Sequence, residues 1–388
     1  MGKRIVIDFD QLVDRNTAED IKYGKIEGID DLIPMWVADM DFRSPVEVRK
    51  ALSDISVRGI YGYSEADSSY DKALIDWFSR RHGYNIDPET VLKLPGVMLG
   101  ISLSVRALTS PGDSVLIFEP LYGPIGKCIK GNGRNLVVSE LVRNGQRYEI
   151  DFDDMRRKIK ENNVKMLVLC NPHNPVGRVW TREELLKIGD ICLENNMVIV
   201  SDEIHADFVY AGHKHIPIAS LSDDLNRITI TCTSPTKTFN LEGIQAANII
   251  VADDSWRRAI DKMSLDTGAF GLNLMGIAAT RAAYTYGDAW LDELLKYLAD
   301  NIALVRSRLK DTKLRSTDTE GTFLMWIDAS SVCPDDAGKY FLDKAHIRFS
   351  EGNSFGRCGK GFVRMNVACP RSVVNDALDR MLDIPDIR

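Results

Sequence analysis

Three short runs in the middle of the chain predict neighbouring buried strands. Residues 165–170, 197–201 and 227–232 are rich in apolar and β-branched side chains, which is typical of strands that are covered on both faces. Between the first two runs lies a segment with helical spacing, and it begins at a capping-box pattern, Thr181 to Glu184. Strand, helix and strand joined by short links predict a right-handed crossover in a parallel sheet.

The same reasoning predicts further elements on both sides of these runs. Before them, we expect helices at 45–54, 70–82 and 97–108 and a strand at 114–118. After them, we expect a strand at 246–252, a helix that begins at 256–263, long helices at 276–286 and 289–309, strands at 322–328 and 362–368, and a helix at 335–346. The glycine-rich segment 354–361 lacks a Gly-Lys-Ser/Thr ending and a following helix, so we expect a flexible loop there and no nucleotide site.

The change to long helices beyond about residue 275 predicts a second domain. A chain of 388 residues exceeds the ~250 to 300 residues at which a single core stops growing. We expect an N-terminal segment at 1–44 that packs with the small domain, a large domain at 45–280 and a small domain at 281–388. The large domain would hold a mostly parallel sheet flanked by helices, and the small one would be α+β, so the fold class is α/β.

Composition and charge limit the classes of function. Apolar residues make up 44% and charged residues 27% of the chain, which excludes a disordered or fibrous protein. The net charge of -7 argues against nucleic acid or an anionic membrane as a partner, since both select clustered Lys and Arg. No run approaches the ~20 apolar residues of a membrane span. The Cys residues form no C-x-x-C pair and several lie in apolar runs, so we expect a reduced, cytoplasmic location.

Three polar side chains follow the three central strands. Asn174 comes after the first strand, Asp202 ends the second, and Lys237 comes after the third, so all three are expected at the carboxyl edge of one sheet, where α/β proteins bind ligands. A lysine amine can form a Schiff base with an aldehyde, and a carboxylate can keep a pyridine nitrogen protonated. The amide can hydrogen-bond the phenolic oxygen of the ring. The set therefore matches the demands of pyridoxal phosphate.

Each of these residues also has an ordinary structural interpretation. A Lys after a strand is usually solvated, an Asp there is usually a turn or cap residue, and Asn-Pro is a turn signal. The ordered set at three successive strand ends favours the cofactor.

Neighbouring elements supply further candidates. Tyr122 follows the strand at 114–118, and its ring can stack on a flat heteroaromatic ligand. The free amides of Val97 and Met98 begin a helix and can hold a phosphate. Arg364 lies within an apolar strand and requires a partner, either a structural salt bridge or a bound carboxylate.

Residues 33–42 have an unusual composition. The stretch 33–42 combines an extended apolar run with alternating acids. It forms either an ordinary strand and turn or a segment across the mouth of a site, which offers Trp36 and backbone groups to a substrate.

His205, His213 and His215 are the only histidine cluster, and no carboxylate stands at a helical i, i+4 position beside them, so we expect no metal site.

Three stretches together resemble a known family. Residues 34–42 (Pro-Met-Trp-Val-Ala-Asp-Met-Asp-Phe), 201–205 (Ser-Asp-Glu-Ile-His) and 362–371 resemble the MalY/PatB-type C-S lyase, or cystathionine β-lyase, branch of the class I/II aminotransferase superfamily. These are fold type I enzymes, and the resemblance covers nearly the whole chain. It implies the aminotransferase-like fold and pyridoxal 5'-phosphate as cofactor.

The resemblance implies a role for each residue around the cofactor ring. Lys237 would bind the cofactor covalently, Asp202 would pair with the pyridine nitrogen, and Asn174 would donate to the ring oxygen. Tyr122 would stack on the ring. His205 stands where many aminotransferases have Tyr, which matches the lyase branch.

The remaining implied roles concern the phosphate and the substrate. Ser234, with the amides of Val97 and Met98, would hold the phosphate, and Tyr63 would reach the phosphate of the neighbouring subunit in a homodimer. Where some relatives have a phosphate-binding Arg, this chain has Gln245, to which we assign no role. Arg364 and the backbone near Trp36 and Ala38 would receive the α-carboxylate of the substrate.

The activity implied is β-elimination from a sulfur amino acid. Cystathionine or a related cysteine S-conjugate would yield a thiol, pyruvate and ammonia. Two alternatives use the same residues: a class I/II aminotransferase, and a pyridoxal-phosphate-binding regulatory protein that acts through a transcription factor. No G-x-G-x-x-G follows a strand, so a nicotinamide dehydrogenase is not expected.

Overall fold

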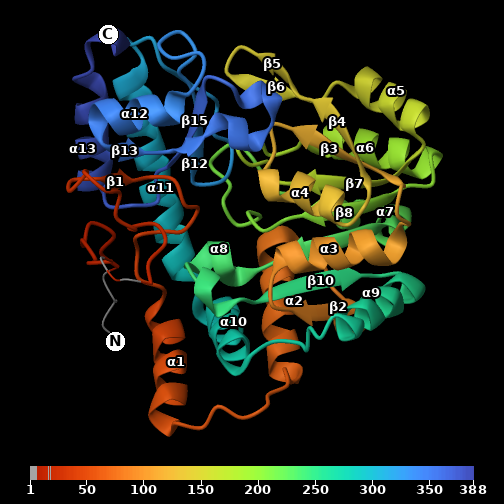
Figure 1. The fold of residues 1–388 in the computed structure, drawn as a ribbon. Helices are drawn as coiled ribbons and strands as arrows, with labels where there is room; N and C mark the ends of the chain where they lie inside the picture. Colours follow the sequence, from red (N-terminus) through yellow and green to blue (C-terminus); the bar gives the residue numbers. More distant parts are fainter. Residues whose placement is uncertain (1–6, 16, 18) are drawn as a thin grey trace.

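The computed structural model describes residues 7–15, 17 and 19–388 (Figure 1). Residues 1–6 of the expected N-terminal segment lie outside the described residues. The fold is a mixed α/β arrangement around a seven-stranded sheet, so the predicted fold class is confirmed. Among the described residues, no helix is both long and apolar enough to cross a membrane.

The large sheet contains the strands predicted from the central apolar runs. In spatial order it consists of β2 (Val91–Leu94), β10 (Ala247–Val251), β9 (Thr229–Thr233), β8 (Val198–Asp202), β7 (Val164–Cys170), β3 (Ser114–Glu119) and β4 (Asn135–Glu140). The strands from β9 to β4 are parallel, and β10 runs antiparallel to both of its neighbours. A short hairpin, β5 (Val142–Asn144) and β6 (Arg147–Glu149), follows β4.

Helices cover both faces of this sheet because successive strand residues point to opposite sides. In β7, Leu167 and Leu169 join one apolar core, whereas Met166 and Val168 join the other. The first core contains α5 (Phe152–Asn162), α6 (Arg182–Glu194) and α7 (Asp223–Ile228), and the second contains α3 (Val97–Leu108), α4 (Gly123–Gly131) and α9 (Asp254–Asp266). The predicted capping box of α6 is present: the Thr181 amide donates to Glu184 Oε2 over 2.8 Å, and the Glu184 amide donates to Thr181 Oγ1 over 3.2 Å.

The remaining helices before α11 are α1 (Val46–Arg58), α2 (Ser68–His82), α8 (Pro235–Phe239) and α10 (Leu274–Tyr286). Helix α1 ends four residues later than the predicted 45–54, at Arg58. Gly59 follows it, adopts a left-handed conformation with φ 71° and donates its amide to Ile55 O. Glycine at this position ends a helix without strain. Short 3-10 turns are Pro88–Thr90, Ile218–Ser220 and Glu242–Ile244.

A second, smaller sheet lies in the last third of the chain. It contains β11 (Arg315–Ser316), β12 (Leu324–Asp328), β15 (Phe362–Asn366) and β14 (Ser350–Glu351), and it packs with α12 (Ala337–Ala345) and α13 (Arg371–Leu382). Helix α11 (Asp288–Leu309) links the two parts, since Leu291 and Leu294 pack with α1, α2 and α10 whereas Val305 and Leu309 pack with the small sheet.

The stretch 33–42 is mostly not a strand. Only β1 (Ile33–Pro34) pairs, in parallel, with β13 (Ile347–Arg348), and Figure 1 shows this N-terminal segment in red beside the small sheet. Residues 36–42, here called the strap, then cross toward the large sheet. The segment 354–361 contains parts of two 3-10 turns, Gly352–Phe355 and Arg357–Gly359, and a last turn spans Pro385–Ile387.

Candidate functional site

The carboxyl ends of three parallel strands meet at one edge of the large sheet. Cys170 of β7 is paired with Asp202 of β8, which is paired with Cys232 of β9. Asn174 and Lys237 follow these strand ends, so both lie beside Asp202. All three line a cavity of about 920 Å³ between the large sheet, the strap and the small sheet, a size typical of small-molecule sites.

The cavity brings together all but one of the residues predicted from the sequence. The predicted residues that line it are Trp36, Ala38, Val97, Met98, Tyr122, Asn174, Asp202, His205, Ser234, Lys237 and Arg364. Tyr63 does not line it, because its side chain is fully exposed on the segment between α1 and α2.

The amine of Lys237 is held by oxygen atoms from two segments. Its Nζ donates to the carbonyl oxygen of Ala38 in the strap and lies 3.1 Å from Glu242 Oε1. Burial raises the pKa of the Glu242 carboxyl. Glu242 was not predicted, although its place five residues after Lys237 on a short turn is readable from the sequence.

Asp202 is a buried carboxylate with spare acceptor capacity. Its side chain is 6% exposed and accepts one hydrogen bond, from the Ile204 amide over 3.2 Å. Burial raises the pKa of Asp202 to about 7, although Lys237 acts to lower it. A cationic N–H donor bound against this carboxylate would stabilise its charged form.

Arg364 is a buried guanidinium without a carboxylate partner among the described residues. Its terminal nitrogens donate to Asn174 Oδ1 over 3.1 Å, Trp36 O over 2.8 Å and Ser350 Oγ over 3.0 Å, and its Nε has no hydrogen-bond partner. Burial lowers the pKa of Arg364 to about 10. The structural salt bridge that remained open from the sequence is absent from the described part of the chain. A carboxylate bound in the cavity is the partner that a desolvated guanidinium favours.

The amino terminus of α3 offers free backbone amides to the cavity. No side chain caps this helix, and the amides of Val97 and Met98 have no partner among the described residues. Nearby, Ser234 Oγ accepts from the Thr236 amide over 3.0 Å and donates to Ala246 O over 2.6 Å, so this hydroxyl also caps α8. Free amides and the helix dipole together attract an anion.

His205 is a neutral ring buried at the cavity wall. Its Nδ1 has no hydrogen-bond partner, and the ring packs against Phe208 and Phe323. Burial, assisted by Lys237 and Arg364, lowers the pKa of His205 to about 3. Within the described chain, no group of three His, Cys, Asp or Glu is placed to hold a metal ion.

A buried charge cluster fixes the strap over the cavity. Lys22 is 1% exposed, and its Nζ lies 2.8 Å from Asp41 Oδ1. Arg15 contacts Asp41 Oδ1 and Asp39 Oδ2, each over 2.7 Å. From the small sheet, Asn366 Nδ2 donates to two strap carbonyls, each over 2.6 Å. The alternating acids of the strap are therefore the anions of this cluster. The sequence did not show which cations pair with them.

Removing one carboxylate of this cluster should destabilise the whole protein. We expect Asp41→Asn to lower the free energy of unfolding by about 3 kcal/mol, because it leaves the buried Lys22 charge undercompensated. The matched control is Asp54→Asn, which breaks an exposed pair with Lys50 and should cost less than about 1 kcal/mol. Urea unfolding measures both, and equal small losses would contradict a structural role for the cluster.

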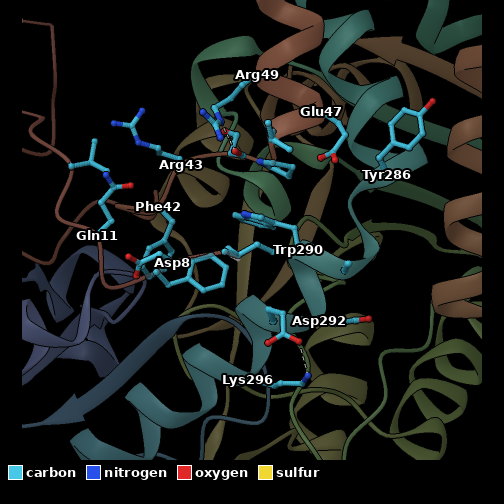
Figure 2. A pocket seen from close by; sticks show the side chains of 18 residues that line it. Asp8, Gln11, Phe42, Arg43, Glu47, Arg49, Tyr286, Trp290, Asp292 and Lys296 are labelled. Atoms are coloured by element: carbon cyan, nitrogen blue, oxygen red, sulfur yellow. Dashed lines mark hydrogen bonds and ion pairs between the residues drawn. The ribbon is translucent and has the colours of Figure 1, made fainter. Parts of the chain in front are cut away.

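A second cavity, of about 610 Å³, is not the candidate site. Figure 2 shows it between the N-terminal segment and the starts of α1 and α11, with Trp290 at its wall. None of the predicted site residues lines it. Lys296 pairs with Glu293 over 2.9 Å, and Asp292 accepts from Arg81 over 2.7 Å, so these charges are already neutralised.

Comparison with known proteins gives a consistent picture. Residues 30–381 match the aminotransferase class I and II family. The chain is 38% identical to cystathionine β-lyase PatB from Bacillus subtilis over 97% of this chain and 99% of that protein. The crystal structure of cystalysin from Treponema denticola, which contains a pyridoxal 5'-phosphate cofactor, has a TM-score of 0.94 at 33% identity and covers 98% of both chains. That of the pyridoxal-phosphate-bound C-S lyase from Staphylococcus hominis has a TM-score of 0.91 at 32% identity and covers 97% of both.

Proposed function

Because the chain belongs to the class I and II aminotransferase family, we propose that it is a pyridoxal-phosphate-dependent carbon-sulfur β-lyase. It cleaves cystathionine or a related cysteine S-conjugate to a thiol, pyruvate and ammonia. The observation that supports this proposal most directly is that an amine, a buried carboxylate and a guanidinium suited to bind a carboxylate line the same cavity: Lys237, Asp202 and Arg364.

The polar groups left without partners fit pyridoxal phosphate. Asp202 has acceptor capacity for the protonated pyridine nitrogen, and Asn174 Nδ2, which has no partner among the described residues, can donate to the ring oxygen. Tyr122 supplies an aromatic face to the ring. The amides of Val97 and Met98 would hold the phosphate, and Ser234 would join them once its hydroxyl turns away from Ala246 O. When bound, the cofactor draws off the electron pair that remains when Cα loses its proton.

The chain's own groups then bind and orient the amino acid. Arg364 receives the α-carboxylate, and the strap carbonyls of Trp36 and Ala38 keep Arg364 and Lys237 in position. Lys237 Nζ takes the proton from Cα, which is general base catalysis. Fixing the carboxylate directs the Cα–H bond toward this amine and contributes through positioning. The thiolate leaves from Cβ, and the three-carbon product hydrolyses to pyruvate and ammonia.

The experiment that tests the function compares L-cystathionine with and without 2-oxoglutarate. We expect equal pyruvate release by the pyridoxal-phosphate-loaded protein in both cases, since β-elimination needs no second keto acid. Glutamate formed only in the presence of 2-oxoglutarate, without pyruvate, would make the protein an aminotransferase. Absence of all products would leave the regulatory function as the alternative.

We also propose a homodimer in which Tyr63 reaches the phosphate of the other subunit. The support is an exposed apolar stretch around α1 and the segment after it: Val57, Ile60, Tyr61 and Tyr63 are 85%, 68%, 63% and 114% exposed. Apolar surface of this kind is typical of an interface. Sedimentation equilibrium should give the mass of two chains, and the mass of one would exclude the shared site.

We also propose the limits of the domains and a cytoplasmic location for the protein. The division at 1–44, 45–280 and 281–388 is supported by the two apolar cores that α11 joins. Because residue 281 lies inside α10, limited proteolysis should leave α10 intact and cut first at exposed links outside it. A cytoplasmic location is supported by seven free cysteines, because oxidising compartments favour disulfides. Cell fractionation tests it.

A further inference from the structure

A second guanidinium lines the same cavity and also lacks an anionic partner. Arg348 ends β13, and its side chain forms no hydrogen bond or ion pair within the described part of the chain. Its guanidinium stacks on Trp36, whose ring centre lies 3.8 Å from the Arg348 Cζ. Stacking on a ring satisfies the face of a guanidinium, whereas its N–H donors lie in the plane and remain available.

Trp36 fixes Arg348 in a defined place relative to Arg364. The indole Nε1 donates to Lys22 O over 3.1 Å, and Lys22 belongs to the buried charge cluster of the strap. The carbonyl oxygen of the same Trp36 accepts from Arg364 over 2.8 Å. One tryptophan therefore contacts Arg348 through its ring and Arg364 through its backbone, so both guanidiniums are set on a rigid segment of the cavity wall.

The surroundings of Arg348 suit an amphipathic ligand. Ile21, Ile26 and Leu342 line the cavity along with it, and they come from the N-terminal segment and α12. The other charged groups of the cavity wall are Lys127, Asp202, Lys237, Glu242, Glu351 and Arg364. Asp202 is the proposed partner of the cofactor, Glu242 contacts Lys237, and Glu351 forms no ion pair within the described chain. Burial lowers the pKa of the Arg348 guanidinium, as expected for a charge that is partly removed from water.

We propose that Arg348 binds a second carboxylate of the substrate, carried by the thiol that leaves. The preferred substrates are then cysteine S-conjugates whose sulfur substituent ends in a carboxylate, and cystathionine belongs to this class. The inference rests on the proposed function. It assigns Arg364 to the α-carboxylate and Arg348 to the distal one, with the thioether between them along the apolar side chains.

The test compares S-(2-carboxyethyl)-L-cysteine with S-propyl-L-cysteine, which has a methyl group in place of the carboxylate. The wild-type holoenzyme should favour the acidic substrate in kcat/KM by about 10- to 100-fold, the range of one hydrogen-bonded charge pair. Arg348→Gln should reduce this preference to nearly none, mainly through KM. Arg348→Lys should keep part of it. The matched control Lys344→Gln removes a charge from an exposed position at the end of α12 and should leave the preference unchanged.

A binding measurement separates this inference from the proposed function. In a cofactor-loaded Lys237→Ala background, calorimetry should give tighter binding of the acidic substrate, and adding Arg348→Gln should remove the difference. Equal binding of the two substrates, or an equal loss for both in Arg348→Gln, would assign Arg348 to support of Trp36 only and overturn the inference. Release of pyruvate from both substrates by the wild-type enzyme without preference would also overturn the inference. If neither substrate yields pyruvate, the proposed lyase function fails, while calorimetry still decides the role of Arg348.

Discussion

Replacing Lys237 with alanine lowers pyruvate release from L-cystathionine by about a thousandfold or more. The expected size follows from the loss of a positioned general base, which contributes about 10²- to 10⁴-fold by itself. Lys237 also supplies the amine that binds the cofactor aldehyde. Its Nζ lies at the junction of α8 and the strap, and no other lysine amine occupies that place in the described chain.

Lys127 provides the control, because it is the other lysine that lines the cavity and its side chain is exposed. Lys127→Ala should change the rate by less than about tenfold, since surface substitutions away from bonded groups have small effects. Steady-state rates measure both variants after loading with the cofactor. Equal losses, or full activity of Lys237→Ala, would remove Lys237 from the chemistry.

Asp202→Asn should lower the activity of the enzyme but raise the stability of the cofactor-free protein. The amide is nearly isosteric but carries no charge, so it cannot stabilise a protonated pyridine nitrogen, and we expect a loss in kcat of about 10²-fold or more, as when a preorganised electrostatic partner is removed. Full activity of this variant would contradict the assignment of Asp202 to the cofactor ring.

In the protein freed of cofactor, the same substitution should increase stability at neutral pH. Burial raises the pKa of Asp202 from 3.8 to about 7, so its contribution to stability is complete below about pH 4 and is lost as the pH rises through about 7. Relative to Asp202→Asn, whose amide does not titrate, the wild type should lose about 4 kcal/mol over this interval. Urea unfolding at pH 4 and pH 8 measures the difference, and a difference independent of pH would contradict the buried, unpaired state of the carboxylate.

The central part of the site was predictable because it depends on local pattern. Apolar runs identify β7, β8 and β9, and parallel pairing then aligns their carboxyl ends, which places Asn174, Asp202 and Lys237 together. The helix start at Val97 is equally local, since Pro-Gly precedes an apolar helix. The end of α1 was placed too early, although the buried Ile55 in its last turn and the glycine that follows Arg58 are both readable from the sequence.

The small-sheet side of the site depends on contacts between distant residues. Arg364 donates to a carbonyl 328 residues earlier in the chain, and Arg348 stacks on the ring of that same Trp36. Nothing local to Arg348 distinguishes it from a solvated strand-end arginine. Lys22 likewise appears in the sequence as an ordinary surface lysine, and only the packing of the N-terminal segment buries it against Asp41.

The most direct test of the central claim is the product balance of the purified, pyridoxal-phosphate-loaded protein with L-cystathionine and no added keto acid. β-Elimination at this site predicts free thiol and pyruvate in equal amounts, with both absent in Lys237→Ala. Thiol without pyruvate, or no product until a keto acid is supplied, would contradict the lyase assignment.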